Sequence, residues 1–259
     1  MKKRILFSVL TLFLLFVGLQ PVHAQESFTI EHYDIQIEVS EDGVYTVTET
    51  LDVQFQQRRH GLNLTLPKRY HNVTWAIGDK VVNRSYVYPI DHIEVLSGHE
   101  VKISDEDDYY NLRLGSADTY AQSSESYKIR YQVHTRDLKL GGIQSFYWNL
   151  ISVNWDTTIE KVTFRVTMPK PFDADQLYFY SDLPQDQFQF QQEGTTFSGE
   201  TLSTLQPFEG ITVKLDLPDQ YFTFPKAANY ALPLALLGGF TTLLSILCLL
   251  KWGKDETLI

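Results

Sequence analysis

Long stretches of this chain alternate apolar and polar residues, and this period of two restricts its fold more than any other feature. The pattern is clear in 33–39 (YDIQIEV) and 45–55 (YTVTETLDVQF), and it returns in 127–133, 162–168 and 211–217. Successive side chains of a strand point to opposite faces, so each segment predicts a strand with one buried and one solvated face. Between the apolar ends of the chain we find no amphipathic helical pattern. We therefore expect an all-β fold, in the form of an antiparallel β-sandwich.

Turn signals and polar stretches suggest where the borders of this β-rich region lie. Asp42-Gly43 separates the first two alternating segments and is typical of a tight hairpin turn. The stretch 76–126 is polar and rich in turn residues. It forms either an inserted hairpin region on one sandwich or a seam between two lobes. We favour one domain over 27–220.

Both ends of the chain are apolar. Residues 231–250 contain no charge, and as a helix at about 1.5 Å per residue they reach roughly 30 Å, the thickness of one hydrocarbon core. At the start, basic residues 2–4 precede the apolar run 5–19 and a small-residue pattern, Val-His-Ala, at 22–24. This layout predicts a signal peptide over 1–24, with an uncleaved anchor as the alternative. The second apolar segment predicts a transmembrane helix over 231–250.

The charges beside the second apolar segment set the expected orientation. Lys251 and Lys254 follow that segment, and positive residues favour the cytoplasmic side of a membrane. We therefore expect a single-pass protein embedded in the cell membrane, with an extracytoplasmic N-terminus. An aromatic juxtamembrane segment over 221–230 and a short cytoplasmic tail over 251–259 complete this arrangement. The expected partner is a protein of the membrane or the envelope.

Composition excludes several classes of function. The chain carries 22 basic and 32 acidic residues, a net charge of −10, so its surface repels phosphates and we expect no nucleic-acid partner. The single cysteine, Cys248, lies in the expected span, which excludes a disulfide or a thiol nucleophile in the outer domain. The outer histidines lack the spacing of a metal motif such as HExxH, and no Gly-rich phosphate loop occurs. We expect no cofactor.

Two groups of carboxylates are candidates for chemistry. Glu49 lies on the apolar face of its strand, where a carboxylate is costly unless it is paired or hydrogen-bonded. It is either a ligand or acid/base group, or a structural group bonded to an Arg, a Trp N–H or backbone amides. We favour the structural interpretation, because the sequence positions no second catalytic carboxylate. The second group is an acidic cluster that offers oxygens to calcium or forms a solvated turn: Asp105, Glu106, Asp107 and Asp108.

Several motifs follow one another in order along the outer region. They are YDIQIEVSEDGVYTVTETLDVQF (33–55), HGLNLTLP (60–67), YNLRLGSAD (110–118) with YKIRYQV (127–133), FYWNLISVNWDTTIEKVTFRVTMP (146–169) and LQPFEGITVKLDLP (205–218). In this order they resemble the N-terminal domain of the DUF2207 family of bacterial predicted membrane proteins, over nearly all of 28–220. The resemblance implies an extracytoplasmic β-rich domain, a following membrane helix and no established activity. Family members commonly carry a basic residue near position 64, where this chain has Leu64.

The longest of these motifs holds the remaining candidates, Trp148, Asn149 and Trp155. Indole rings stack on sugars or on protein partners, although such rings more often fill a sandwich core. Together with Glu49, these residues are our candidates for a binding site. We nominate no residue as catalytic.

The sequence leaves three functions open. The first, which we favour, is a membrane-anchored module that binds envelope material or assembles with a partner. The second is a cell-envelope enzyme that acts on glycans through carboxylates such as Glu49. The third is a sensory domain that relays a signal through a partner in the membrane. An open cleft with a second carboxylate beside Glu49 would favour the enzyme, whereas a sealed and paired Glu49 would remove its basis.

Overall fold

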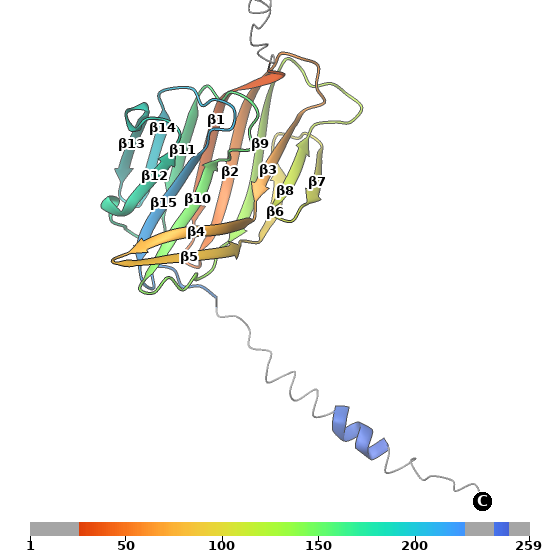
Figure 1. Cartoon of the computed structure of the whole chain (residues 1–259). Helices are drawn as coiled ribbons and strands as arrows, with labels where there is room; N and C mark the ends of the chain where they lie inside the picture. Colours follow the sequence, from red (N-terminus) through yellow and green to blue (C-terminus); the bar gives the residue numbers. More distant parts are fainter. Residues whose placement is uncertain (1–25, 226–240, 249–259) are drawn as a thin grey trace, which may run out of the picture. The chain divides into compact units, whose positions relative to one another are not determined.

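The computed structural model of this chain describes residues 26–225 and 241–248. The chain divides into two compact units, Met1–Thr223 and Phe224–Ile259. The regular secondary structure of the described part of the first unit consists of strands and two short 3₁₀ helices, which confirms the expected all-β class (Figure 1). In chain order its elements are β1 (Phe28–Val39), β2 (Val44–Phe55), β3 (Leu62–Pro67), β4 (Arg69–Ile77), β5 (Lys80–Val87), β6 (Ile90–Val95), β7 (Val101–Asp105), β8 (Tyr109–Leu114), β9 (Ser124–His134), β10 (Ile143–Ile151), β11 (Val162–Thr167), the 3₁₀ helix η1 (Ala174–Gln176), β12 (Leu177–Ser181), the 3₁₀ helix η2 (Gln185–Gln187), β13 (Phe188–Glu193), β14 (Thr196–Thr201) and β15 (Ile211–Pro218).

The largest layer is a seven-stranded sheet in the order β13-β14-β11-β1-β2-β9-β6. The strands β1 and β2 form the hairpin expected around Asp42-Gly43, where Gly43 supplies a φ of +80° that a residue with a Cβ rarely adopts. Alternate residues of both strands are buried on one face, as their period predicts. The expectation of a purely antiparallel sheet is wrong at one pair, because β1 and β11 run parallel and the sheet is therefore mixed. Parallel neighbours are joined by long crossovers, which the alternation of residues within a strand does not reveal.

A second layer covers the buried face of this sheet. Tyr45 of β2 contacts Phe146 of β10 with ring centroids 4.8 Å apart, and Phe164 of β11 lies 5.6 Å from Phe179 of β12. These rings join the three-stranded sheet β10-β15-β12 to the large sheet. The other three-stranded sheet, β3-β8-β7, lies over the same face, since Leu64 of β3 lines a cavity together with residues of β1, β2 and β9. The core of the unit lies between these two layers.

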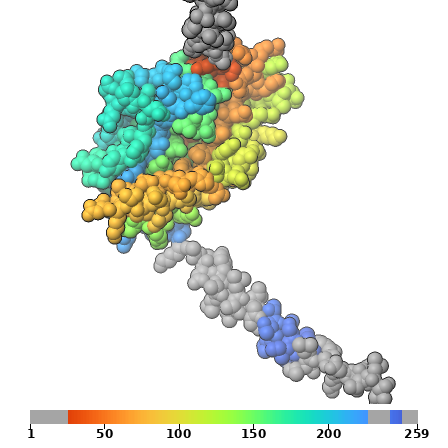
Figure 2. Space-filling view, viewed as in Figure 1, coloured from red at the N-terminus to blue at the C-terminus, as the bar shows by residue number. Residues whose placement is uncertain are grey.

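The β4–β5 hairpin packs on the outer side of the second layer. Trp75 and Tyr70 of β4 lie 6.1 and 5.9 Å from Tyr147 of β10, measured between ring centroids. The hairpin crosses one end of the unit, where Figure 2 shows it as an orange band. The polar stretch 76–126 therefore supplies strands to three of the four sheets, instead of forming one inserted hairpin.

The first unit reaches slightly past the expected border at 220. Tyr221 and Phe222, which we assigned to the juxtamembrane segment, are buried. The backbone N–H of Phe222 donates a hydrogen bond to the Gln144 side chain at 2.6 Å. These two rings belong to the packing of the β unit.

The expected membrane segments fall largely outside the described residues. The signal peptide over 1–24 and the tail over 251–259 lie outside them, and of the expected span only 241–248 is described, as α-helix. Within the described ranges, no helix combines the length and the apolar character that a membrane crossing requires.

Candidate functional site

Three neighbouring strands of the large sheet bring two tyrosines to Glu49. Glu49 of β2 is paired with Ile35 of β1 and Ile129 of β9. Tyr33 lies two positions before Ile35, and Tyr131 lies two positions after Ile129. Diagonal neighbours on one face of a sheet are within reach of long side chains. The Tyr33 hydroxyl donates to Oε2 of Glu49 and the Tyr131 hydroxyl donates to Oε1, each at 2.5 Å. Both carboxyl oxygens therefore have a donor inside the core.

The other sequence candidates for binding surround the same carboxyl group. Trp148, Asn149 and Trp155 line one cavity with Glu49, which is 5% exposed. The cavity measures about 10 Å³, and a single water needs roughly 10–15 Å³. Among the described residues that line it, Glu49 is the sole carboxylate. Leu64, where the family resemblance implies a basic residue, lines the cavity as well. The hydroxyl groups of Tyr33 and Tyr131, and not a basic side chain, supply the hydrogen bonds to the Glu49 carboxyl group.

The two tryptophans pack against the tyrosines that hold Glu49. Trp155 meets Tyr33 edge-to-face with ring centroids 6.0 Å apart, and Trp148 lies 6.4 Å from Tyr131. Both indoles are buried. Asn149 points its amide oxygen toward β15 and accepts a hydrogen bond from that strand at 2.9 Å. These contacts build a structural core around the carboxyl group and leave no face of either indole for a sugar to stack on.

Burial controls the ionisation of this cluster. Loss of water raises the pKa of Glu49 above its usual 4.5, and the hydrogen bonds from Tyr131 and Tyr33 lower it in part. Burial, together with the nearby Glu49 charge, raises the pKa of both tyrosines well above their usual 10.0. The tyrosines therefore stay neutral donors near neutral pH, with the carboxyl group as their acceptor. A general acid or base would need contact with a substrate, which the closed cavity excludes.

The raised pKa of Glu49 predicts a particular dependence of stability on pH. A group whose pKa is higher in the folded state contributes stability below its unfolded pKa, and this contribution is lost as pH rises through the folded pKa. Relative to Glu49→Gln, the wild type should therefore lose free energy of unfolding as the pH rises from about 4.5, at up to about 1.4 kcal/mol per pH unit, and then level off. Urea unfolding of both proteins across this range measures the difference. A constant difference, or one that grows in favour of the wild type, contradicts the assignment.

The acidic cluster begins at Asp105, the last residue of β7, and continues through 106–108, the turn that leads to β8. Lys68 forms an ion pair with its first residue, and Arg69 and His71 contact its last carboxylate at 3.2 and 3.1 Å. The backbone N–H groups of Lys68 and Arg69 donate to the last carbonyl of the cluster. Basic residues at the junction of β3 and β4 thus neutralise part of the turn. Within the described part of the chain, these four acidic side chains do not bring three ligand atoms together.

A larger hollow lies on the face of the seven-stranded sheet that is turned away from the second layer. The pairing of β1, β11, β14 and β13 aligns two polar rows across these four strands. One row is Asp34, Thr163, Glu200 and Gln189, and the other is Gln36, Arg165, Ser198 and Gln191. These side chains line a groove of about 630 Å³, which we call the outer-face groove.

Arg165 carries an unpartnered charge into this groove. Asp34 accepts hydrogen bonds from two groove neighbours at 2.6 and 2.9 Å, and Glu200 forms an ion pair with Lys161 at 2.6 Å. Arg165 is exposed and has neither a hydrogen bond nor an ion pair among the described residues. Its planar fork of N–H donors matches a carboxylate or a phosphate. Sequence analysis missed this group, because residues spread from 34 to 200 share no local motif.

The fold and the site define a mixed β domain whose buried carboxyl group is sealed and whose one face carries a polar groove. The matching family is described as a predicted membrane protein (DUF2207), N-terminal domain, and the match spans residues 29–217. The chain belongs to this family, which confirms the resemblance found in the sequence. No curated protein matches the chain.

The solved structures that match this chain differ strongly from it in sequence and have TM-scores below 0.5. Leukotriene A4 hydrolase from Saccharomyces cerevisiae is 12% identical with a TM-score of 0.42, and the match covers 78% of this chain and 33% of that one. An M1 zinc metallopeptidase from Deinococcus radiodurans is 10% identical with a TM-score of 0.35, over 73% of this chain and 42% of that one. The chain thus spans less than half the length of either protein.

Proposed function

We propose that this protein is a membrane-anchored extracytoplasmic binding module, whose outer-face groove holds a glycan of the cell envelope that carries carboxylates. The observation that carries the proposal is the exposed, unpartnered Arg165 in a groove of about 630 Å³. Ligand sites commonly span about 300–1,000 Å³, so the groove has room for a few sugar units. The amide and hydroxyl side chains of both rows supply the donors and acceptors that sugar hydroxyls require.

The charge of the chain narrows the class of ligand. With a net charge of −10, the protein repels dense polyanions such as nucleic acids. Asp34 and Glu200 flank Arg165 in the groove and add to this repulsion. An isolated carboxylate on an otherwise neutral glycan can pair with the Arg165 guanidinium. Such a glycan brings no further negative charges for the protein to repel. The net negative charge therefore favours a glycan with sparse carboxylates over a polyphosphate.

The sealed Glu49 argues against an enzyme that acts through this carboxylate. An enzyme acting on glycans uses two carboxylates on either side of the scissile bond. Glu49 has two tyrosine donors, and its cavity of about 10 Å³ has no second carboxylate among the described lining residues. The anchoring part of the proposal rests on the family description, on the apolar segment 231–250 and on the lysines that follow it.

Photo-crosslinking in intact cells tests this function. A photoreactive residue at Gln191 of the full chain should capture carbohydrate, which mass spectrometry detects after purification. Arg165→Gln should reduce the yield at least about tenfold, because a charge-assisted bond contributes about 1.5–3 kcal/mol. Arg130→Gln is the matched control, since Arg130 is an exposed arginine that already pairs with Glu94 at 2.7 Å. Capture of protein alone would refute the proposal, and so would equal carbohydrate yields from the wild type, Arg165→Gln and Arg130→Gln.

A further inference from the structure

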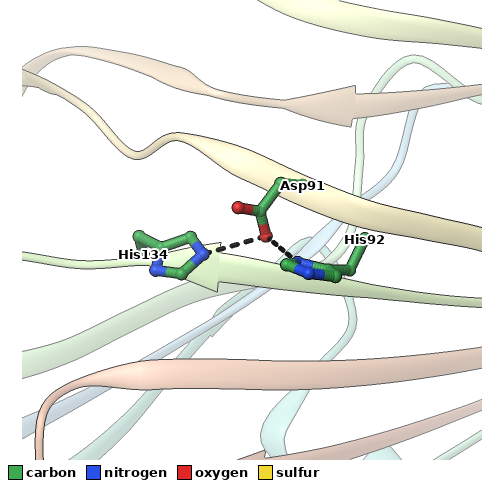
Figure 3. A group of neighbouring side chains, drawn as sticks. All are labelled: Asp91, His92 and His134. Carbon is green, nitrogen blue, oxygen red and sulfur yellow. Dashed lines mark hydrogen bonds and ion pairs between the residues drawn. The ribbon is translucent and has the colours of Figure 1, made fainter.

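Three potential metal ligands converge at the edge of the large sheet opposite to the outer-face groove. Asp91 and His92 belong to β6, the edge strand, and His134 is the last residue of the neighbouring strand β9. Figure 3 shows both imidazole rings directed at the Asp91 carboxylate. His92 Nδ1 lies 2.7 Å and His134 Nε2 lies 2.9 Å from the same oxygen, Asp91 Oδ1. The proposed glycan site uses none of these groups.

An irregularity of the backbone produces this convergence. The pairing of β6 with β9 shifts register between Asp91 and Glu94, and His92 has a φ of +50°. Neighbouring residues of a regular strand point to opposite faces, whereas a bulge re-aims a side chain. The bulge therefore turns His92 to the side of Asp91. The backbone N–H of His134 donates to the carbonyl of Pro89 at 2.9 Å, which holds the end of β9 beside this bulge.

The spacing of the three ligand atoms suits a small transition-metal ion. The three atoms all lie within 4.8 Å of one another. A tetrahedral zinc ion with bonds of about 2.0–2.1 Å separates its ligand atoms by about 3.4 Å, so the present 2.7 and 2.9 Å contacts would open by well under 1 Å. The ring nitrogens that face Asp91 become ligands when their protons move to the other ring nitrogen or leave. A metal ion would then replace two N–H···O bonds.

The chemistry of the donors separates zinc from calcium and magnesium. Two imidazole nitrogens and one carboxylate are typical ligands of zinc, whereas calcium and magnesium prefer oxygen throughout. Asp91 and His92 are exposed and His134 is partly exposed, which leaves the remaining coordination positions to water or to a partner.

We propose that Asp91, His92 and His134 form a binding site for one Zn²⁺ ion. The ion would link the edge strand β6 to the end of β9, because His92 and His134 lie 42 residues apart in the sequence. Because the site lies on an edge strand and keeps open positions, the ion can also accept a ligand from another molecule.

Calorimetric titration of the metal-free full-length protein with zinc chloride tests this site. We expect one Zn²⁺ per chain, and His134→Gln and Asp91→Asn should each weaken binding at least about tenfold, because even the loss of an outer-shell partner typically costs about 10–100-fold in metal affinity. His71→Gln is the matched control, since His71 is an exposed histidine that contacts the Asp108 carboxylate at 3.1 Å. It should bind zinc like the wild type.

Three results would overturn the proposal. They are no binding by the wild type, unchanged affinity in both ligand variants, and a loss of affinity in His71→Gln without a loss in His134→Gln. A thermal melt of each variant without metal accompanies the titration, and Asp91→Asn keeps the shape of the side chain should His134→Gln fold poorly. Titration with calcium chloride should give no heat at this site.

Discussion

Gly61→Ala should destabilise the β unit by about 2–6 kcal/mol, because backbone strain and overpacking each cost about 1–3 kcal/mol. Gly61 precedes β3 and has a φ of +125°, which residues with a Cβ rarely adopt. A Cβ at this position would overlap the carbonyl oxygen of Leu114 at the end of β8. That oxygen belongs to the backbone, so the clash is relieved only if the end of the β3–β8 ladder moves.

The glycine that follows β8 has the same two features, a positive φ and a Cβ position that overlaps a backbone oxygen. Gly115 has a φ of +121°, and its Cβ would overlap the carbonyl oxygen of His60. Gly78→Ala is the control, because Gly78 also has a positive φ but nothing lies within 4 Å of its Cβ position. It should cost only about 1–2 kcal/mol. Urea unfolding of the full-length protein in detergent compares these variants. Equal stabilities of Gly61→Ala and Gly78→Ala would show that the close approach is absent.

Glu49→Ala should cost about 3–5 kcal/mol of the free energy of unfolding. The substitution removes the acceptor of both tyrosine hydroxyls and leaves Tyr33 and Tyr131 unsatisfied in the core. Each buried donor without a partner costs about 1–3 kcal/mol, and the emptied volume adds a cavity term. Since whole domains are stable by only about 5–15 kcal/mol, this loss is large.

Glu49→Gln is the control for this experiment, because it keeps the volume and one carbonyl acceptor. It should lose clearly less stability than Glu49→Ala at neutral pH. Tyr131→Phe should fall between wild type and Glu49→Ala, since it removes one of the two hydrogen bonds. If Glu49→Ala unfolds within about 1 kcal/mol of the wild type, the carboxyl group is not a structural anchor.

The alternation of residues predicts the strands and the buried position of Glu49 from the sequence, because both are local properties. Its partners are not local: Tyr33 lies 16 residues before it and Tyr131 lies 82 residues after it. The favoured structural interpretation named an Arg, a Trp N–H or backbone amides as donors, and the structure supplies tyrosine hydroxyls instead. The donors depend on the order β1-β2-β9, which the period of two does not contain.

The two surface sites depend even more on strand order. The outer-face groove aligns Gln36 with Arg165 through the parallel β1–β11 pair, whereas the sequence favoured antiparallel pairs throughout. His92 and His134 meet at Asp91 through a bulge between β6 and β9, although their spacing along the chain matches no metal motif. Sequence patterns find residues that are costly to bury, such as Glu49, more readily than residues that become neighbours across a sheet.

Under the proposed function, ligand binds at the outer-face groove and not at Glu49. Photo-crosslinking from position 191 in intact cells tests this by comparing the wild type, Glu49→Gln and Arg165→Gln. A thermal melt first shows that all three proteins are folded. We expect Glu49→Gln to capture as much carbohydrate as the wild type and Arg165→Gln to capture at least about tenfold less. If Glu49→Gln captured no carbohydrate while Arg165→Gln captured as much as the wild type, binding at the outer-face groove would be contradicted.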